Sequence, residues 1–412
     1  MIGNYLKFLC LLQFLLSGEL TAIKAVFIKP VSHLCSEQLS TYGLDNLEHY
    51  YNNQPLSGDT SKFDCMRTAQ ALFNEWCEVV HWDERTHEVG VQFSHFLVDN
   101  QGKLEPAIFW TLDSNLLIHS EKHEKFFTEF FPQPVTYADP KTLHICNHIV
   151  LIQPFFDKKS NMHYSAGTRF TRIPEHDTNN LFAISCYEPE TGTFVQREVP
   201  VEYAWACDTT YKDQERRQVY VALLKSWCST SWGVSEKNKR IIPYVWGGSS
   251  FLATIKNEGF EKVEDAFAGK KISYWQRPNA KPPVYGFDCS GLVMRVAQIC
   301  GIPYWFKTTA TALRHGVEIK NYQDMQNGDL IVWNGHMVIV SDKEKGLLIE
   351  SVGYGTGYGR LHEARLAERF GNVRSYKDLF LVKEKQEELV ILCKNGVVYK
   401  KVPEFKVISL MG

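Results

Sequence analysis

A cysteine at the start of an apolar helix is the first residue whose position could do chemistry. Cys289 follows a turn at Gly286, and apolar residues recur at helical spacing from Leu292 to Cys300, with Gly301 where the helix should end. A thiol in the first helical turn faces unpaired backbone N–H groups and the positive end of the helix dipole. We therefore expect a lowered pKa for Cys289, which favours the thiolate that attacks carbonyl carbons. A buried structural cysteine is the alternative that this position alone leaves open.

Two polar side chains further along the chain could complete a nucleophilic site. The stretch 327–333 predicts a turn that leads into a strand, and His336 opens a second apolar strand. A third apolar strand ends at Glu350. An imidazole can take the proton of a thiol, and a third polar group can fix the tautomer of the ring. The order therefore predicts a cysteine peptidase in which Cys289, His336 and Glu350 are catalytic.

Four sequence blocks between residues 236 and 375 together resemble the NlpC/P60 family of cysteine peptidases. The blocks are Pro243-Tyr244-Val245-Trp246-Gly247-Gly248, Gly286-Phe287-Asp288-Cys289-Ser290-Gly291-Leu292-Val293, Asn327-Gly328-Asp329-Leu330 and His336-Met337-Val338-Ile339-Val340. The resemblance implies an α+β fold, in which a papain-like catalytic domain follows mainly-β SH3-like domains. It also implies cleavage of the stem peptides of bacterial peptidoglycan, typically after γ-D-glutamate.

The resemblance also implies roles for individual residues. Cys289 would be the nucleophile and His336 the base, while the hydroxyl of Tyr244 would line the oxyanion side of the site. Four more residues are expected to bind substrate or to lie beside the oxyanion: Trp246, Asp288, Ser290 and Thr308.

The sequence departs from the family pattern in three places. The third catalytic position is usually histidine, and the matching strand here ends in Glu350, whose carboxylate can hold an imidazolium equally well. The segment 249–284 is an insertion, which we interpret either as a lid or docking surface or as inert decoration. Thr308 stands where an aspartate that binds the substrate amine is expected.

The remaining sequence predicts an exported protein of several domains. Residues 1–25 read as a signal peptide with an apolar run from Phe8 to Leu16, and Ala22 or Ala25 could precede the cleavage point. An uncut N-terminal anchor is the alternative, but the run is too short for stable membrane insertion across a bilayer. We expect a periplasmic or secreted location.

Periodicity divides the rest of the 412-residue chain. The strand-like segment 69–80 resembles the opening of bacterial SH3-like domains, which implies such domains over 26–155 and 156–205, with a generic β domain as the alternative. The catalytic domain is expected over 206–375. A helix is predicted over 214–227, and a C-terminal hairpin in 376–412.

The composition limits the kinds of molecule that the protein is expected to bind. The chain has 45 basic and 47 acidic residues and no basic run, which argues against nucleic acid. The segment 144–148 suits a strand better than a zinc site, and the expected chemistry needs no metal or organic cofactor. We therefore expect an endopeptidase that acts on peptidoglycan or free muropeptides at the bond between γ-D-glutamate and a diamino acid. The alternatives are an N-acetylmuramoyl-L-alanine amidase and a catalytically silent wall-binding protein.

Overall fold

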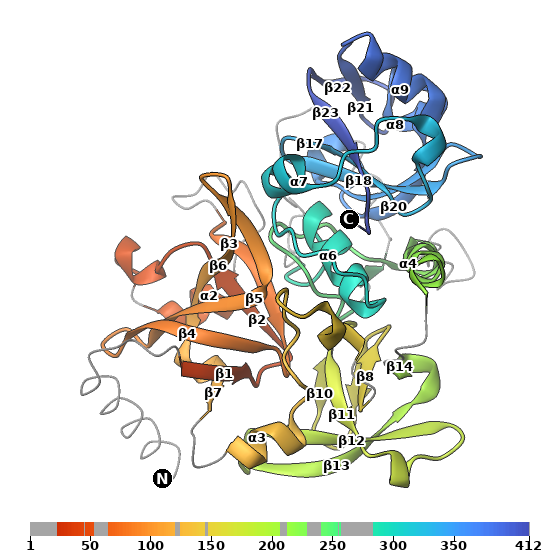
Figure 1. Ribbon diagram of the computed structural model, residues 1–412. Helices are drawn as coiled ribbons and strands as arrows, with labels where there is room; N and C mark the ends of the chain where they lie inside the picture. The colour runs from red at the N-terminus through yellow and green to blue at the C-terminus, as the bar shows by residue number, and fades with distance from the viewer. Residues whose placement is uncertain are drawn as a thin grey trace. The chain divides into compact units, whose positions relative to one another are not determined.

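The computed structural model describes residues 23–44, 46–52, 65–119, 124–144, 147–206, 212–228, 240–253, 255–256 and 283–411. The chain divides into two compact units. Unit 1 comprises Met1–Asn53, Gln70–Phe96 and Pro106–Thr209, and unit 2 comprises Gln54–Ala69, Leu97–Glu105 and Thr210–Gly412. In Figure 1, unit 1 runs mostly from red to yellow-green and unit 2 mostly from green to blue.

A seven-stranded sheet begins the chain, with the strand order β3-β2-β6-β5-β4-β1-β7. Its strands are β1 (Ile23–Phe27), β2 (Val31–Cys35), β3 (Arg67–Leu72), β4 (Trp76–Asp83), β5 (Glu88–Asn100), β6 (Lys103–Leu112) and β7 (Leu116–Ile118). The short helices of this part are η1 (Leu39–Tyr42), α2 (Leu47–Asn52), η2 (Asp113–Asn115), α3 (Glu124–Phe130) and η4 (Pro140–His144).

Strand β1 bears on the predicted signal peptide, most of which lies outside the described residues. It pairs with β4 on one side and β7 on the other, and Ala25 is fully buried. Cleavage after Ala22 would leave this strand whole, whereas cleavage after Ala25 would cut through it.

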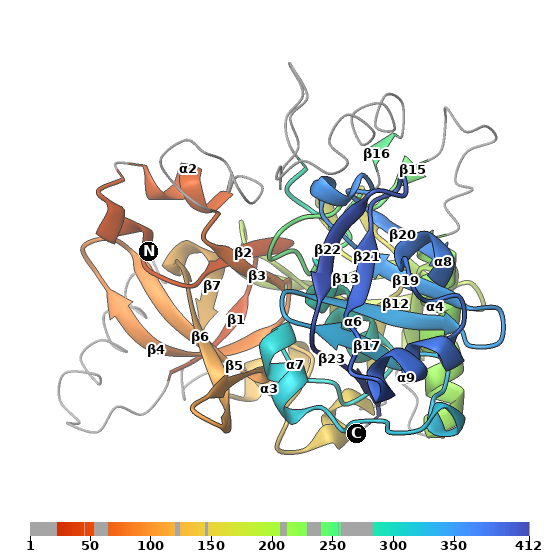
Figure 2. The same cartoon turned by 90° about the horizontal axis from the view of Figure 1, so that it is seen from above.

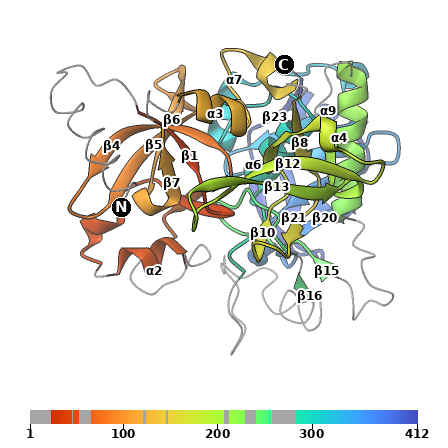
Figure 3. The same ribbon diagram turned by 90° about the horizontal axis from the view of Figure 1, so that it is seen from below.

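A five-stranded sheet with the order β13-β12-β11-β8-β14 follows in unit 1. Its strands are β8 (His148–Leu151), β11 (Arg169–Arg172), β12 (Leu181–Glu188), β13 (Thr193–Pro200) and β14 (Ala204–Ala206), beside the hairpin of β9 (Phe155–Asp157) and β10 (Met162–Tyr164) and the turns η5 (Pro174–His176) and η6 (Val201–Tyr203). Figure 3 shows β12 and β13 as one long hairpin. Its first strand, β8, begins at His148, whereas the sequence analysis expected the second β domain to begin at residue 156.

Aromatic side chains fill the core of unit 1. Phe73, directly after β3, packs edge-on against Tyr164 with ring centroids 5.1 Å apart, and Phe170 lies in the same cluster. Strand-forming residues of this kind explain why the region folds as sheets. The prediction of a strand-rich N-terminal region is therefore confirmed.

Unit 2 is organised around a five-stranded antiparallel sheet with the order β20-β19-β18-β17-β23. Its strands are β17 (Leu330–Trp333), β18 (His336–Asp342), β19 (Leu347–Ser351), β20 (Leu361–Arg365) and β23 (Phe405–Ile408). The helices are α4 (Asp213–Cys228), α6 (Cys289–Ile299), α7 (Thr309–His315), η8 (Tyr322–Asp324), η9 (Tyr354–Thr356), α8 (Leu366–Arg369) and α9 (Tyr376–Glu384). Two hairpins complete the unit: β15 (Arg240–Ile241) with β16 (Ile255–Lys256), and β21 (Leu389–Leu392) with β22 (Val398–Val402).

Alternation along the strands gives this sheet two buried faces. Val338, Val340 and Leu348 belong to a core that also contains Leu366 of α8 and Leu379 of α9. The alternate residues of β18 and β19 face the other way, where α6 packs against both strands. Figure 1 shows β17 and β18 between α6 and the pair α8 and α9. The unit therefore has mixed α and β content, as expected.

The segment after residue 376 is part of this architecture. Strand β23 pairs with β17 at the edge of the central sheet, and the hairpin of β21 and β22 lies next to α8 (Figure 2). Gly371 N donates to Val390 O over 2.8 Å, which joins the hairpin to the chain that follows α8.

The insertion predicted over 249–284 falls largely outside the described residues, which omit 254 and 257–282. Its predicted function as a lid or docking surface therefore stays a prediction. Within the described part of the chain, no helix is long and apolar enough to span a bilayer.

Helix α4 confirms the helix predicted over 214–227. It buries Tyr220, Leu224 and Trp227 and packs against β19, β20 and α6. Arg217 forms an ion pair with Asp329, which is 1% exposed and also accepts from Gln326 N at 2.6 Å and Leu410 N at 3.3 Å. One carboxylate thus ties α4 to the start of β17 and to the end of the chain.

The fold predicts a large stability loss when Asp329 is replaced. Asp329→Ala should lower the free energy of unfolding by about 3 kcal/mol or more, because the partly buried Arg217 and two N–H groups lose their acceptor. Denaturant unfolding measures this, with Asp324→Ala as the control, because Asp324 is exposed and accepts from an exposed Asn321 side chain. Equal losses in the two variants would contradict the importance of this ion pair.

Candidate active site

Cys289 is the first residue of α6, and two glycine blocks hold it there. Asp288 is the N-cap of the helix, and its carboxylate accepts from Gly291 N at 2.5 Å and from Ser290 Oγ at 3.1 Å. A Cβ atom at Gly291 would lie 2.1 Å from Gly248 O, so only glycine permits this approach. The Trp-Gly-Gly turn and the start of the cysteine helix therefore interlock. As predicted, the helix ends before Gly301, which has a positive φ of 70°.

The prediction of a lowered pKa for Cys289 is wrong. Burial raises the pKa of this thiol to about 12, and the neighbouring Asp288 carboxylate acts in the same direction. The backbone N–H groups of Met337 and Ser290 and the Lys307 ammonium lower the pKa, but by less. The helix position alone suggested a thiolate, whereas the apolar surroundings of the thiol favour its neutral form. Cys289 is therefore a protonated thiol in the free protein.

His336 and Glu350 are brought together by strand pairing. Both side chains lie on the sheet face that carries Val338 and Leu348, because side chains alternate along β18 and β19. His336 Nε2 lies 2.7 Å from Glu350 Oε2, and both residues are buried. Burial lowers the pKa of His336 despite this carboxylate, with Arg369 and Lys400 adding to the effect. The ring is therefore neutral near pH 7.

The Glu350 carboxylate contacts the side chains of Arg369, His336 and His362. Its burial favours the neutral acid, but Arg369, His336 and His362 outweigh that effect and hold the pKa of the carboxyl well below its usual range. Arg369 Nε donates to Glu350 Oε1, and Arg369 Nη2 donates to Oε2 at 3.2 Å. His362, directly opposite Glu350 on β20, has Nε2 3.4 Å from Oε1.

The ionised state of Glu350 fixes the tautomer of His336. A carboxylate only accepts hydrogen bonds, so the proton of the neutral imidazole must lie on Nε2. The lone pair of Nδ1 is then free to accept a proton from another group. The arrangement can therefore remove the proton of a thiol and keep the resulting imidazolium in place.

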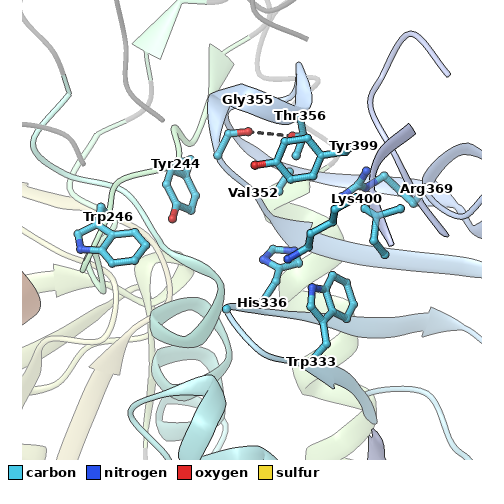
Figure 4. A pocket seen from close by; sticks show the side chains of 13 residues that line it. Tyr244, Trp246, Trp333, His336, Val352, Gly355, Thr356, Arg369, Tyr399 and Lys400 are labelled. Carbon is cyan, nitrogen blue, oxygen red and sulfur yellow. Dashed lines mark hydrogen bonds between the residues drawn. The ribbon is translucent and has the colours of Figure 1, made fainter. Parts of the chain in front are cut away.

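A cleft of about 320 Å³ opens beside His336. Figure 4 shows Tyr244 and Trp246 on one side of it, and Trp333, Arg369, Tyr399 and Lys400 around the other. Trp246 is 45% exposed, and Arg67 Nε donates to its backbone carbonyl over 2.8 Å. The cleft therefore exposes one indole for contact with a bound molecule.

Tyr244 is fixed beside the thiol and stays protonated. Tyr354 Oη donates to Tyr244 O at 3.0 Å, and Tyr244 N donates to Gly359 O at 2.9 Å. Burial and the neighbouring Cys289 raise the pKa of the Tyr244 phenol well above its usual value. The hydroxyl points into the cleft (Figure 4), where it can donate a hydrogen bond to a developing negative charge.

Three predicted substrate-binding residues have structural contacts and do not line the cleft. Asp288 and Ser290 belong to the N-cap of α6. Thr308 is the N-cap of α7, where its hydroxyl accepts from Thr311 N at 3.1 Å. Within the described residues, no group of three histidine, cysteine or acidic side chains could hold a metal ion.

Arg369, His362 and Lys400 belong to the site or its cleft and stand outside the residues predicted from the sequence. Local sequence gives no signal for the burial of Arg369, because Arg365 and Glu368 beside it are charged and exposed. Strand alternation could have placed His362 opposite Glu350. Lys400 lies 64 residues after His336 in numbering (400 − 336), and no local pattern links the two.

The comparison with known families identifies the domain that carries this site. Residues 242–374 match the model of the NlpC/P60 family. The chain therefore contains an NlpC/P60 family domain, which supports a hydrolase of the cysteine peptidase class that acts on peptidoglycan. A comparison with the curated proteins found no match.

The solved structures that are similar to this chain include two proteins of the NlpC/P60 type. One is described as a novel NlpC/P60 endopeptidase from Photobacterium damselae subsp. piscicida, with 11% identity and a TM-score of 0.46 over 95% of this chain and 74% of that chain. The other is NlpC2 from Trichomonas vaginalis, with 11% identity and a TM-score of 0.30 over 84% of this chain and 94% of that chain.

Removal of Arg369 should destabilise the site. Arg369→Met leaves the Glu350 carboxylate buried without its cation, which should cost roughly 3–5 kcal/mol of unfolding free energy. The double variant Arg369→Met/Glu350→Gln should recover part of that loss, because it no longer buries an uncompensated carboxylate. Arg365→Met, four residues earlier and exposed, serves as the control. A double variant that is less stable than Arg369→Met alone would contradict the account.

The lowered pKa of His336 predicts a stability loss on acidification. In the unfolded chain the His336 imidazole titrates at about pH 6.5 and binds a proton more readily than it does in the folded protein. Its contribution to the free energy of unfolding is therefore fully present above that pH and is lost as the pH falls below it. His336→Asn should therefore lose less unfolding free energy than the wild type between about pH 7 and pH 5. Chemical denaturation at several pH values measures both slopes. An identical slope would show that the folded ring titrates normally.

Proposed function

We propose that this protein is an exported cysteine endopeptidase that cleaves the stem peptides of peptidoglycan. The bond cut is the one between γ-D-glutamate and a diamino acid. The observation that carries the proposal is the His336–Glu350 pair, within a segment that matches the NlpC/P60 family. The residue after His336, Met337, donates its backbone N–H to the sulfur of the buried Cys289. Three groups of the required types, from α6, β18 and β19, supply a nucleophile, a base and an orienting carboxylate.

The proposed reaction starts from a neutral thiol and a neutral imidazole. The Cys289 sulfur attacks the carbonyl carbon while His336 Nδ1 takes the thiol proton, so no free thiolate has to exist beforehand. The backbone N–H of Cys289 and the hydroxyl of Tyr244 donate to the oxyanion. The imidazolium then protonates the leaving amine, and a thioester remains on Cys289.

Water completes the cycle. His336, neutral again, removes a proton from a water molecule that attacks the thioester, and the carboxylic acid product leaves as the thiol is reformed. Glu350 stabilises the imidazolium in both half-reactions, because its carboxylate is ionised and is 2.7 Å from the ring.

The strand-rich N-terminal region fits the proposal as an accessory part of a wall enzyme. We assign to it SH3-like domains and to residues 206–375 a papain-like fold. The N-terminal apolar run supports export to the periplasm or the exterior. Trp246, exposed in the cleft, is assigned to substrate contact.

The proposal predicts that Cys289→Ala abolishes hydrolysis of the tripeptide L-Ala-γ-D-Glu-diaminopimelate. Loss of a covalent nucleophile should reduce kcat by several orders of magnitude, while the fold persists. Cys300→Ala, at the other end of the same helix, should keep wild-type turnover. Mass spectrometry of the products measures both.

The identity of the products separates the other functions. Release of the complete stem peptide from muramic acid would indicate an amidase. Turnover by Cys289→Ala within about tenfold of the wild type would exclude the proposed nucleophile. Retained binding of wall fragments by an inactive wild-type protein would indicate a silent binding protein.

A further inference from the structure

Lys400 places a cation in the cleft from outside the segment that matches the family. It lies on β22, directly opposite Ile391 of β21, and both residues line the cleft. Its ammonium lies 5.9 Å from the centre of the Trp333 ring, and that ring is 5.1 Å from the ring of His336. Figure 4 shows the side chain extending toward His336 and Trp333.

The surroundings of Lys400 are positively charged. Among the described residues that line the cleft, none is acidic, and the cations are Arg369 and Lys400 in addition to the titratable His336. Arg369 has its charge matched by Glu350. In the described part of the chain, the Lys400 ammonium forms no hydrogen bond or ion pair, and its contact there is with the face of the Trp333 ring. A half-buried ammonium in such a place attracts an anion that the protein itself does not supply.

The proposed reaction indicates which part of the substrate meets Lys400. His336 gives its proton to the leaving amine, so the leaving residue must lie on the His336 side of the cleft. In an amino acid that leaves with its α-amine, the α-carboxylate is bonded to the same carbon as that amine. A carboxylate of the leaving residue therefore lies within reach of an ammonium beside His336.

We infer that Lys400 is a specificity-determining residue that binds a carboxylate of the leaving diamino acid. The site would thus prefer stem peptides that end at the diamino acid, whose α-carboxylate is free, or those whose diamino acid carries a side-chain carboxylate. This inference rests on the proposed function, because the position of the leaving group follows from the direction of the reaction.

Binding to the Cys289→Ala protein tests the inference without turnover. The ligands are L-Ala-γ-D-Glu-L-Lys as the free acid, the same peptide as its C-terminal carboxamide, and a diaminopimelate peptide amidated at the α-carboxyl alone. Calorimetry should give a Kd for the free acid about tenfold lower than for the carboxamide, as expected for a charge-assisted hydrogen bond in a half-exposed site. Tight binding of the third peptide would identify the side-chain carboxylate as the partner.

Variants of Lys400 and of the neighbouring Lys401 test whether Lys400 causes the difference in Kd between the free acid and the carboxamide. In the Cys289→Ala protein, Lys400→Met should reduce the ratio of the two Kd values to near one, and Lys400→Arg should keep most of it. Lys401→Met is the control, because Lys401 is exposed on the other face of β22 and pairs with Glu388. An unchanged ratio in Lys400→Met, no preference in the parent, or no binding of any peptide would overturn the inference.

A wrong endopeptidase assignment and a wrong role for Lys400 would give different experimental results. If the protein with Cys289 intact hydrolyses none of the three peptides, the endopeptidase assignment is wrong. The dependence of binding on Lys400 can still hold in that case. If hydrolysis occurs with equal kcat/KM for acid and carboxamide, the endopeptidase stands and the role of Lys400 is excluded.

Discussion

The buried carboxylate of Glu350 is the group on which the geometry of the candidate site depends. A buried charge needs compensation, and here the Arg369 guanidinium, the His336 ring and the nearby His362 provide it. These contacts join β18, β19, β20 and α8 at one end of the sheet. Arg369 Nη1 also donates to Leu392 O at the end of β21, which connects the carboxylate to the hairpin that carries Lys400. One ion pair thus positions both the imidazole and the cation of the cleft.

Burial also determines how a reaction could begin. The same low-polarity surroundings raise the pKa of Cys289 and lower that of His336. The thiol and the imidazole are therefore both neutral in the free protein. Charge would appear only during proton transfer, when Glu350 faces the new imidazolium and Tyr244 can donate to the oxyanion. Such a site could stabilise charge where it develops in the proposed reaction.

Sequence patterns predicted most of the local structure that carries the site. The apolar period from Leu292 to Cys300 placed α6 correctly, and the short apolar runs before Trp333 and Glu350 placed β17 and β19. The family blocks also placed Tyr244 in the cleft wall. These features depend on local spacing, which a single sequence contains.

Other features depend on contacts that spacing does not encode. The pKa of Cys289 follows from burial by elements distant in sequence, so the helix-dipole argument alone gave the wrong direction. Asp288 was expected to bind substrate, and in the structure its Oδ1 atom caps the N-terminus of α6. Arg369 lies on α8 and Lys400 on the C-terminal hairpin, and only the fold reveals that both line the cleft with His336.

The protonation state of His336 is the most direct test of this account. Nitrogen-15 NMR of the imidazole in the free protein at neutral pH distinguishes the two neutral tautomers from the imidazolium. We expect a neutral ring with its proton on Nε2, and the Nε2 signal should shift in Glu350→Gln. An imidazolium at neutral pH, or a neutral ring with the proton on Nδ1, would contradict the central role given to the buried carboxylate.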